Sequence, residues 1–175
     1  RYWADIFTQM DSIGVGSLPI IVLTGFFTGA VLALQSATSL KEFGSVSLTG
    51  NLVALSMVKE LGPVLTGLMV SGRNSSGMAS ELGSMKVTEQ IDAMRALGTD
   101  PMRKLVTPRL YATVFMLFFL TILADAFGII GGAIVSIGLL GLNASSYFNN
   151  SYRALAYGDI VQGLTKPLFS GFIIA

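Results

Sequence analysis

The feature that most constrains this chain is a long stretch without any charged side chain, residues 12–40. Apolar residues dominate the stretch, and a helix needs about 20 of them to cross the hydrocarbon core of a bilayer. Over the whole chain, 52% of the residues are hydrophobic and only 12% are charged, whereas soluble domains average about 25% charged residues. The sequence therefore predicts an all-α, polytopic helical membrane protein.

The apolar segments together predict a single membrane domain over residues 1–175. The first segment, 2–16, has an apolar stripe with aromatic residues at its start, which fits a helix lying in the membrane interface; a short core helix is the alternative. The expected spans cover residues 17–40, 50–72, 110–139 and 158–175. Because the last apolar run reaches the final residue, we expect that the chain is truncated at its carboxyl end.

Positive charge is concentrated between the second and third expected spans, in residues 73–109. This segment holds six of the eleven basic residues, namely Arg73, Lys86, Arg95, Arg103, Lys104 and Arg109. Loops rich in Lys and Arg stay on the cytoplasmic side of a membrane. We therefore place 73–109 and the amino terminus in the cytoplasm, and we place 41–50 and a polar, aromatic loop over 141–157 outside.

Two adjacent charges interrupt the second expected span near its middle. Lys59 and Glu60 are costly at that depth unless they pair or face a polar cavity. Pro63 has no N–H to offer the carbonyl of Lys59, so we expect a kink and a free carbonyl beside the two charges. A polar cavity inside the membrane is our interpretation. The alternative is a shallower span, in which both side chains reach the membrane surface.

Two further polar residues lie within expected spans. Gln35, near the outer end of the first span, either lines a polar pocket or lies at the level of the headgroups. Asp125, in the outer half of the third span, needs a partner such as Lys59. We expect a structural role for Asp125, with a proton-binding role as the alternative.

Pairs of small residues four positions apart occur in the first and third expected spans. They are Gly25 with Gly29 and Gly128 with Gly132. This spacing lets the backbones of two membrane helices approach closely. We expect both pairs to lie in helix–helix contacts.

Residues 86–97 have the pattern of a short amphipathic helix. Its apolar stripe consists of Val87, Ile91, Met94 and Leu97, and its polar face of Glu89, Gln90, Asp92 and Arg95. We expect Gly98 to end this helix. Thr99 or Asp100 should then cap the next one, with Pro101 in its first turn.

Several kinds of chemistry are missing from the sequence. The chain has no cysteine and no histidine, which excludes disulfides, thiol catalysis and the usual zinc sites. It has no GxxxxGK[ST] motif for binding nucleotide phosphates, and a net charge of +1 gives no indication of nucleic-acid binding. We expect a membrane conduit that is not an enzyme, binds no cofactor or metal, and receives its energy from another protein.

Several sequence blocks closely resemble the MlaE/YrbE permease family, the membrane subunits of ABC-type phospholipid transporters associated with MCE proteins. The blocks are KELGPVLTGLMVSGR, ASELGSMKVTEQIDAM, LGTDP, LVTPR, LTILAD and GIIGG. The resemblance extends over nearly the whole chain. One departure is Asn74-Ser75-Ser76, where family members usually carry a smaller, more apolar residue after the arginine.

The resemblance implies a homodimer with an interfacial helix and about five spans in each subunit, of which about four are present here. It implies a partner ATPase (MlaF-like) that uses ATP and Mg, and an outer MCE-domain protein (MlaD-like). A STAS-domain regulator (MlaB-like) is a further partner that it allows. The implied role is the maintenance of membrane lipid asymmetry, and the implied location is a bacterial inner membrane in preference to a plastid inner envelope.

The resemblance also assigns site residues. A phospholipid pocket at the dimer interface, open to the outside, would be lined by Gln35, Lys59 and Glu60. A coupling helix seated in a groove of the ATPase would use Glu81, Lys86, Glu89, Ile91, Asp92, Met94 and Leu97.

Two other functions are compatible with the same residues. An ion-coupled secondary transporter could use the carboxylates of Glu60 and Asp125, although such a carrier does not need the long cytoplasmic segment. A non-transporting scaffold would use residues 73–109 for docking alone.

Overall fold

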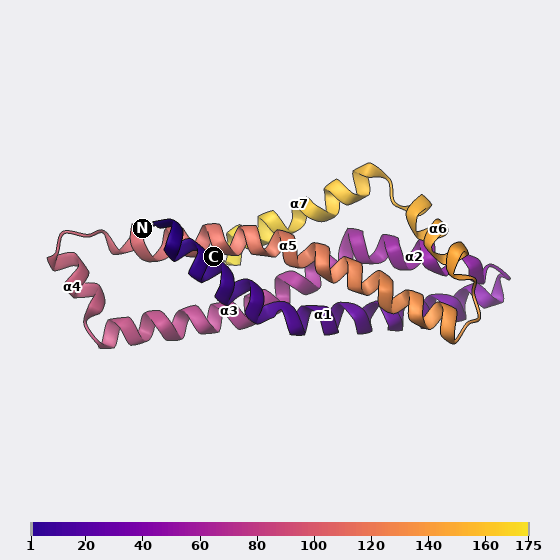
Figure 1. Cartoon of the computed structure of the whole chain (residues 1–175), viewed down its shortest axis with the longest axis horizontal. Coiled ribbons are helices and arrows are strands. Elements are labelled where there is room, and N and C mark those ends of the chain that lie inside the picture. The colour runs from indigo at the N-terminus through magenta and orange to yellow at the C-terminus, as the bar shows by residue number, and fades with distance from the viewer. Residues whose placement is uncertain (1, 175) are drawn as a thin grey trace.

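The computed structural model describes residues 2–174 and the side chains of 6–174. The helices form an elongated bundle with α4 at one end and α6 at the other (Figure 1). In chain order they are α1 (Tyr2–Glu42), the 3₁₀ turn η1 (Val46–Leu48), α2 (Thr49–Ser56), the π-helical turn η2 (Met57–Leu61), α3 (Gly62–Val87), α4 (Gln90–Ala96), α5 (Pro101–Gly138), α6 (Ala144–Ala154) and α7 (Tyr157–Ile174).

Three helical segments within the described residues are long and apolar enough to cross a membrane. They are Ile6–Glu42, Val46–Val87 and Pro101–Gly138. The prediction of an all-α, multi-pass membrane protein is therefore confirmed. The expected span over 158–175 corresponds to α7, which is not one of these three segments.

The expected interfacial helix over 2–16 is continuous with the first span. Both belong to α1, which runs from Tyr2 to Glu42 without interruption. Pro19 lies inside this helix, but the helix continues through it. The boundary expected at residues 16–17 is therefore not a break in the backbone.

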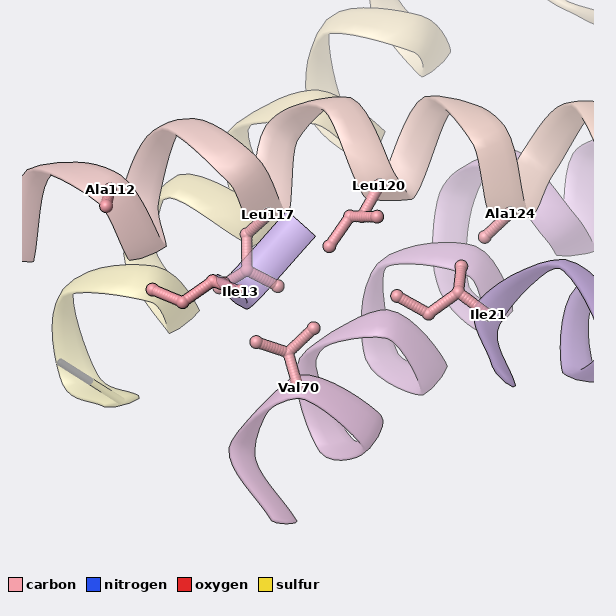
Figure 2. Close-up of a cluster of buried hydrophobic side chains, with 7 residues drawn as sticks. All are labelled: Ile13, Ile21, Val70, Ala112, Leu117, Leu120 and Ala124. Atoms are coloured by element: carbon pink, nitrogen blue, oxygen red, sulfur yellow. The ribbon is translucent and has the colours of Figure 1, made fainter. Parts of the chain in front are cut away.

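The main hydrophobic core joins α1, α3 and α5. Figure 2 shows the side chains of α1 and α3 directed toward α5. The buried members are Ile13, Ile21, Val70, Ala112, Leu117, Leu120 and Ala124. This core fixes α3, the second half of the second apolar segment, against α1 and α5.

Helices α1 and α5 approach each other closely at their glycines. A Cβ added to Gly29 would overlap the carbonyl oxygen of Gly128, and one added to Gly25 would lie 2.7 Å from the carbonyl oxygen of Ala124. A Cβ on Gly132 would lie 3.3 Å from the carbonyl oxygen of Gly29. The two glycine pairs found in the sequence therefore meet each other, as their spacing predicts.

The expected outer loop over 141–157 contains a helix, α6, that packs on α2 and η1. The Asn143 side chain caps α6 by accepting a hydrogen bond of 3.1 Å from the Ser145 N–H. The Ser151 hydroxyl donates to the carbonyl of Gly50 at 3.0 Å, and the Asn150 amide donates to that of Ser47 at 2.8 Å. The prediction of a loop missed this helix because its residues are polar and aromatic.

Candidate functional site

A change of helix type marks the position of the charged pair in the second span. Residues Met57–Leu61 form a π-helical turn, and the Gly62 N–H bonds to the carbonyl of Met57, five residues earlier. Pro63 follows and cannot bond to the carbonyl of Lys59. π-helical turns inside α-helices occur often at functional sites.

The carbonyl of Lys59, which Pro63 leaves free, accepts a hydrogen bond from a side chain on α7. The Lys166 ammonium donates to the Lys59 carbonyl oxygen at 2.6 Å and lies 2.8 Å from the Glu60 carboxylate. The Lys59 ammonium lies 2.9 Å from the carboxylate of Asp159. We call these four residues, Lys59, Glu60, Asp159 and Lys166, the charged junction.

The charged junction is open on one side. Glu60 keeps 64% of its side chain exposed and Lys59 keeps 36%, so each has an ion partner within the chain and a free face. The two predictions for these residues were a polar cavity and a shallow position, and neither named a partner for them on the last apolar segment. The structure instead pairs each of them with an opposite charge on a neighbouring helix.

Helix α7 lies very close to the π-helical turn. A Cβ added to Gly163 would overlap the carbonyl oxygen of Val58, so only glycine permits this approach. An open groove of about 320 Å³ between α3 and α7 includes Lys166 in its wall. The remaining wall is mostly apolar: Pro63, Val64, Gly67, Leu68, Ser71, Ser170, Ile173 and Ile174.

Asp125 does not pair with Lys59, and that expectation is wrong. Lys59 pairs with Asp159, while Asp125 is 8% exposed and its Oδ1 has no hydrogen-bond partner among the described residues. A Cβ on Gly62 would overlap that oxygen. Asp125 therefore packs directly against the helix backbone where η2 meets α3.

Gln35 lies apart from the ion pairs of the charged junction. Its residue is exposed on α1, and its carbonyl accepts a hydrogen bond of 3.3 Å from the hydroxyl of Ser39. No hydrogen bond among the described residues joins its side chain to Lys59 or Glu60. The structure thus brings together two of the three predicted pocket residues.

The predicted amphipathic helix over 86–97 is divided in two. Helix α3 ends at Val87, and Glu89 adopts the left-handed conformation with φ 57° before α4 begins. Val87 and Leu97 are 85% and 81% exposed, whereas Ile91 and Met94 are partly buried. The stripe is therefore not one surface, because its two outer members lie beyond the ends of α4.

An ion pair closes the turn between α3 and α4. The Lys86 ammonium donates to Asp92 Oδ2 at 2.7 Å. This hydrogen bond, together with the charge of Lys86, holds the pKa of the Asp92 carboxyl below its ordinary value. As predicted, Gly98 follows α4 with φ 72°. Of the two predicted caps, Thr99 and Asp100, the structure uses Asp100, whose side chain accepts a hydrogen bond from the Met102 N–H at 3.0 Å.

Glu81 is directed toward α5 and not toward α4. Its carboxylate lies 2.6 Å from Arg109 Nη2, and the Arg109 side chain is only 6% exposed. This pair ties the last part of α3 to the first part of α5.

Sequence reasoning missed Asp159, Lys166 and Arg109 as members of these sites. A signal for the first two was present: the second and the last apolar segments each carry one acidic and one basic residue. Charges within a membrane are expected to pair, so opposite charges in two spans indicate that the two helices are neighbours. Arg109 gave no such signal because it is one of several basic residues in its segment.

Comparison with known proteins identifies close relatives over nearly the whole chain. The family described as Permease MlaE matches residues 6–175. A probable ABC transporter permease protein of Rickettsia typhi is 42% identical over 99% of this chain and 67% of its own length. The intermembrane phospholipid transport system permease protein MlaE of Haemophilus influenzae is 40% identical over 97% of this chain and 65% of its own length.

A plant protein is also similar. Protein TRIGALACTOSYLDIACYLGLYCEROL 1, chloroplastic, of Arabidopsis thaliana is 34% identical over 99% of this chain and 50% of its own length. The chain thus spans between half and about two thirds of these relatives.

Proposed function

Because the chain belongs to the MlaE permease family, as its motifs indicated, we propose that it is the membrane subunit of an ABC-type phospholipid transporter. The proposal is supported most directly by one observation. The charged junction and the apolar groove between α3 and α7 share Lys166. A phospholipid has the same two parts, a charged headgroup and apolar chains.

In the proposed site, the charged junction recognises the headgroup. An ammonium group meets a phosphate as a point charge, and both Lys59 and Lys166 are held in place by carboxylates. Glu60, which is largely exposed, is placed to bind the amine of a headgroup. The groove lined by Val64 and Leu68 would receive an acyl chain.

A second copy of the chain would complete the pocket. In the single chain the groove between α3 and α7 is open, and a homodimer that covers it would enclose a lipid in an apolar environment. Gln35 would then line the pocket from α1, if the dimer brings it near the charged junction. An outer MCE-domain protein (MlaD-like) would exchange lipid with this pocket.

ATP hydrolysis in a partner subunit (MlaF-like), which binds ATP and Mg, would supply the energy. The surface offered to that partner is the cytoplasmic end formed by Val87, α4 and Leu97, where apolar side chains are exposed. A STAS-domain regulator (MlaB-like) would act on the ATPase. The complex would reside in a bacterial inner membrane and maintain lipid asymmetry.

The test is reconstitution of the complex with its ATPase and a labelled phospholipid. We expect Lys59→Ala with Glu60→Ala to abolish lipid cross-linking and transport, because both charges that face the headgroup are lost. A matched control is Lys41→Ala with Glu42→Ala, the same dipeptide at the end of α1, which should leave both intact. Unimpaired transport in the first variant would disprove the pocket assignment.

Asp125 supports a second candidate, an ion-coupled transporter that uses Glu60 and Asp125. A buried carboxylate with an unpartnered oxygen is the kind of group that binds a proton or sodium in secondary carriers. Against it, Glu60 is already paired with Lys166. Lipid flux that continues without ATP but stops when the proton gradient is removed would favour this candidate over the ABC mechanism.

A further inference from the structure

Two adjoining cavities lie at the cytoplasmic end of the bundle, far along α3 from the charged junction. One, of about 210 Å³, is lined by Thr8, Gln9, Glu81, Met85, Lys104, Leu105, Pro108 and Arg109. The other, of about 230 Å³, is lined by Gln9, Ser12, Ile13, Arg73, Asn74, Gly77, Met78 and Glu81. Gln9 and Glu81 belong to both linings, so the two cavities adjoin at these residues between α1, α3 and α5.

The cavities have an excess of positive charge. Their walls hold Arg73, Lys104 and Arg109 against one carboxylate, Glu81. That carboxylate is engaged by Arg109 Nη2. Arg73 donates a hydrogen bond of 2.9 Å to the hydroxyl of Ser17, and this hydroxyl is neutral. No ion pair among the described residues includes Arg73 or Lys104. Two positive charges are therefore left without a counter-ion.

Two buried donors in the same walls lack acceptors. Arg109 is 5% exposed and Asn74 is 7% exposed. Arg109 Nη1 and Asn74 Nδ2 make no hydrogen bond within the described residues. Buried donors are nearly always satisfied in native proteins, and in this chain one such donor lies in the wall of each cavity. Donors and uncompensated charges together indicate an anionic ligand with several acceptor oxygens.

The position of the cavities selects the source of the anion. Residues of the basic segment 73–109 line both cavities, and the positive charge of that segment places them at the level of the cytoplasmic headgroups. Apolar side chains, including Ile13, Met78 and Leu105, line the same spaces, and a free phosphate would gain nothing from them. A lipid headgroup attached to its glycerol and upper acyl chains uses both kinds of wall.

We propose that these cavities form a binding site for the phosphodiester headgroup of an acidic phospholipid of the cytoplasmic leaflet. Arg73 and Lys104 supply positive charge. Asn74 and Arg109 supply hydrogen-bond donors once their side chains shift slightly toward the ligand. The site is separate from the charged junction. The two proposals have in common only that the ligand is a phospholipid. Binding at the cavities is measured without ATP, so either proposal can fail while the other stands.

The experiment uses the full permease complex in lipid nanodiscs without nucleotide. A photoreactive amino acid replaces Met85, which lines the first cavity, and cross-linked lipid is identified by mass spectrometry. We expect phosphatidylglycerol to be captured in preference to phosphatidylcholine. Arg73→Gln with Lys104→Gln should lower this capture roughly tenfold, since each basic group near an acidic lipid contributes to binding.

Arg103→Gln is the matched control, because Arg103 is 84% exposed next to Lys104 and does not line either cavity. It removes a positive charge from the same turn and should leave capture unchanged. Unaltered capture in the double variant, an equal loss in Arg103→Gln, or equal capture of the two lipids would overturn the proposal. Displacement of the lipid by millimolar inorganic phosphate, but not by chloride of equal ionic strength, would assign the site to a free anion and overturn the lipid source.

Discussion

Two helix contacts in this protein are built in opposite ways. Helices α1 and α5 meet through glycine backbones, with no charge between Gly29 and Gly128. Helix α7 meets η2 through ion pairs and a lysine that binds a main-chain carbonyl. The first contact has one close-packed arrangement. The second uses groups that can exchange partners with a ligand or a neighbouring subunit, so it is where rearrangement is expected.

The largest expected effect is at the glycine contact. Gly29→Ala places a methyl group against the carbonyl of Gly128, and overpacking of this kind costs about 1–3 kcal/mol or more. Thermal unfolding in detergent should show a clear loss of stability. Gly72→Ala is the control, because a Cβ there meets nothing within 4 Å; equal stability of the two variants would contradict the backbone contact.

At the charged junction, Lys166→Met should cost about 1–3 kcal/mol, because it leaves the Lys59 carbonyl without a donor and Glu60 without its partner. Pro63→Ala restores an N–H that can bond to that carbonyl. We therefore expect Pro63→Ala to recover part of the lost stability in the Lys166→Met background, measured as a double-mutant cycle. Strict additivity of the two changes would show that the Lys166–carbonyl bond is not stabilising.

At the α4 end of the bundle, the proposed docking surface predicts that Leu97→Asp weakens co-purification of the ATPase about tenfold or more. An exposed leucine that becomes buried in an interface contributes roughly 1.5–3 kcal/mol, and an aspartate must instead be desolvated. Thr99→Asp introduces the same charge two residues away and should have little effect. Normal ATPase recovery with Leu97→Asp would remove Leu97 from the docking surface.

The smallest effect concerns the exposed Lys86–Asp92 pair. The pKa of Asp92 in the folded protein lies below its ordinary value, so the ion pair stabilises the fold fully at pH above the ordinary value, about 3.9. That stabilisation is lost as the pH falls through the lowered pKa. Asp92→Asn removes the ion pair at neutral pH and should therefore make α4 less firmly held. Hydrogen exchange of a peptide over 85–98 should accelerate modestly in the variant, and unchanged exchange would show that the pair does not hold α4.

Local chemistry made much of the fold predictable. The absence of an N–H in Pro63 predicted the free carbonyl of Lys59, and the spacing of the glycines predicted the contact between the first and third spans. The Gly98 stop followed from residue type, and so did a cap at Thr99 or Asp100, of which the structure uses Asp100. The class of helical membrane protein required only composition and the lengths of the apolar segments.

The parts that were missed depend on tertiary contacts. Which donor would reach the Lys59 carbonyl depends on α7, and no local pattern places Lys166 beside it. The break at Glu89 was missed because a left-handed conformation is uncommon for a residue with a side chain, and the apolar stripe continued through it. The charged junction was therefore only half predicted.

The continuity of α3 has a mechanical consequence. It begins beside the charged junction at Gly62 and ends at Val87 next to α4, and its 26 residues give a rod about 39 Å long at 1.5 Å per residue. With no loop along its length, a tilt of about 5° applied at one end of such a rod displaces the other by about 3 Å. That displacement is comparable to the 2.8 Å between Glu60 and Lys166, so any tilt of α3 that is passed on past the core at Val70 acts directly on the charged junction.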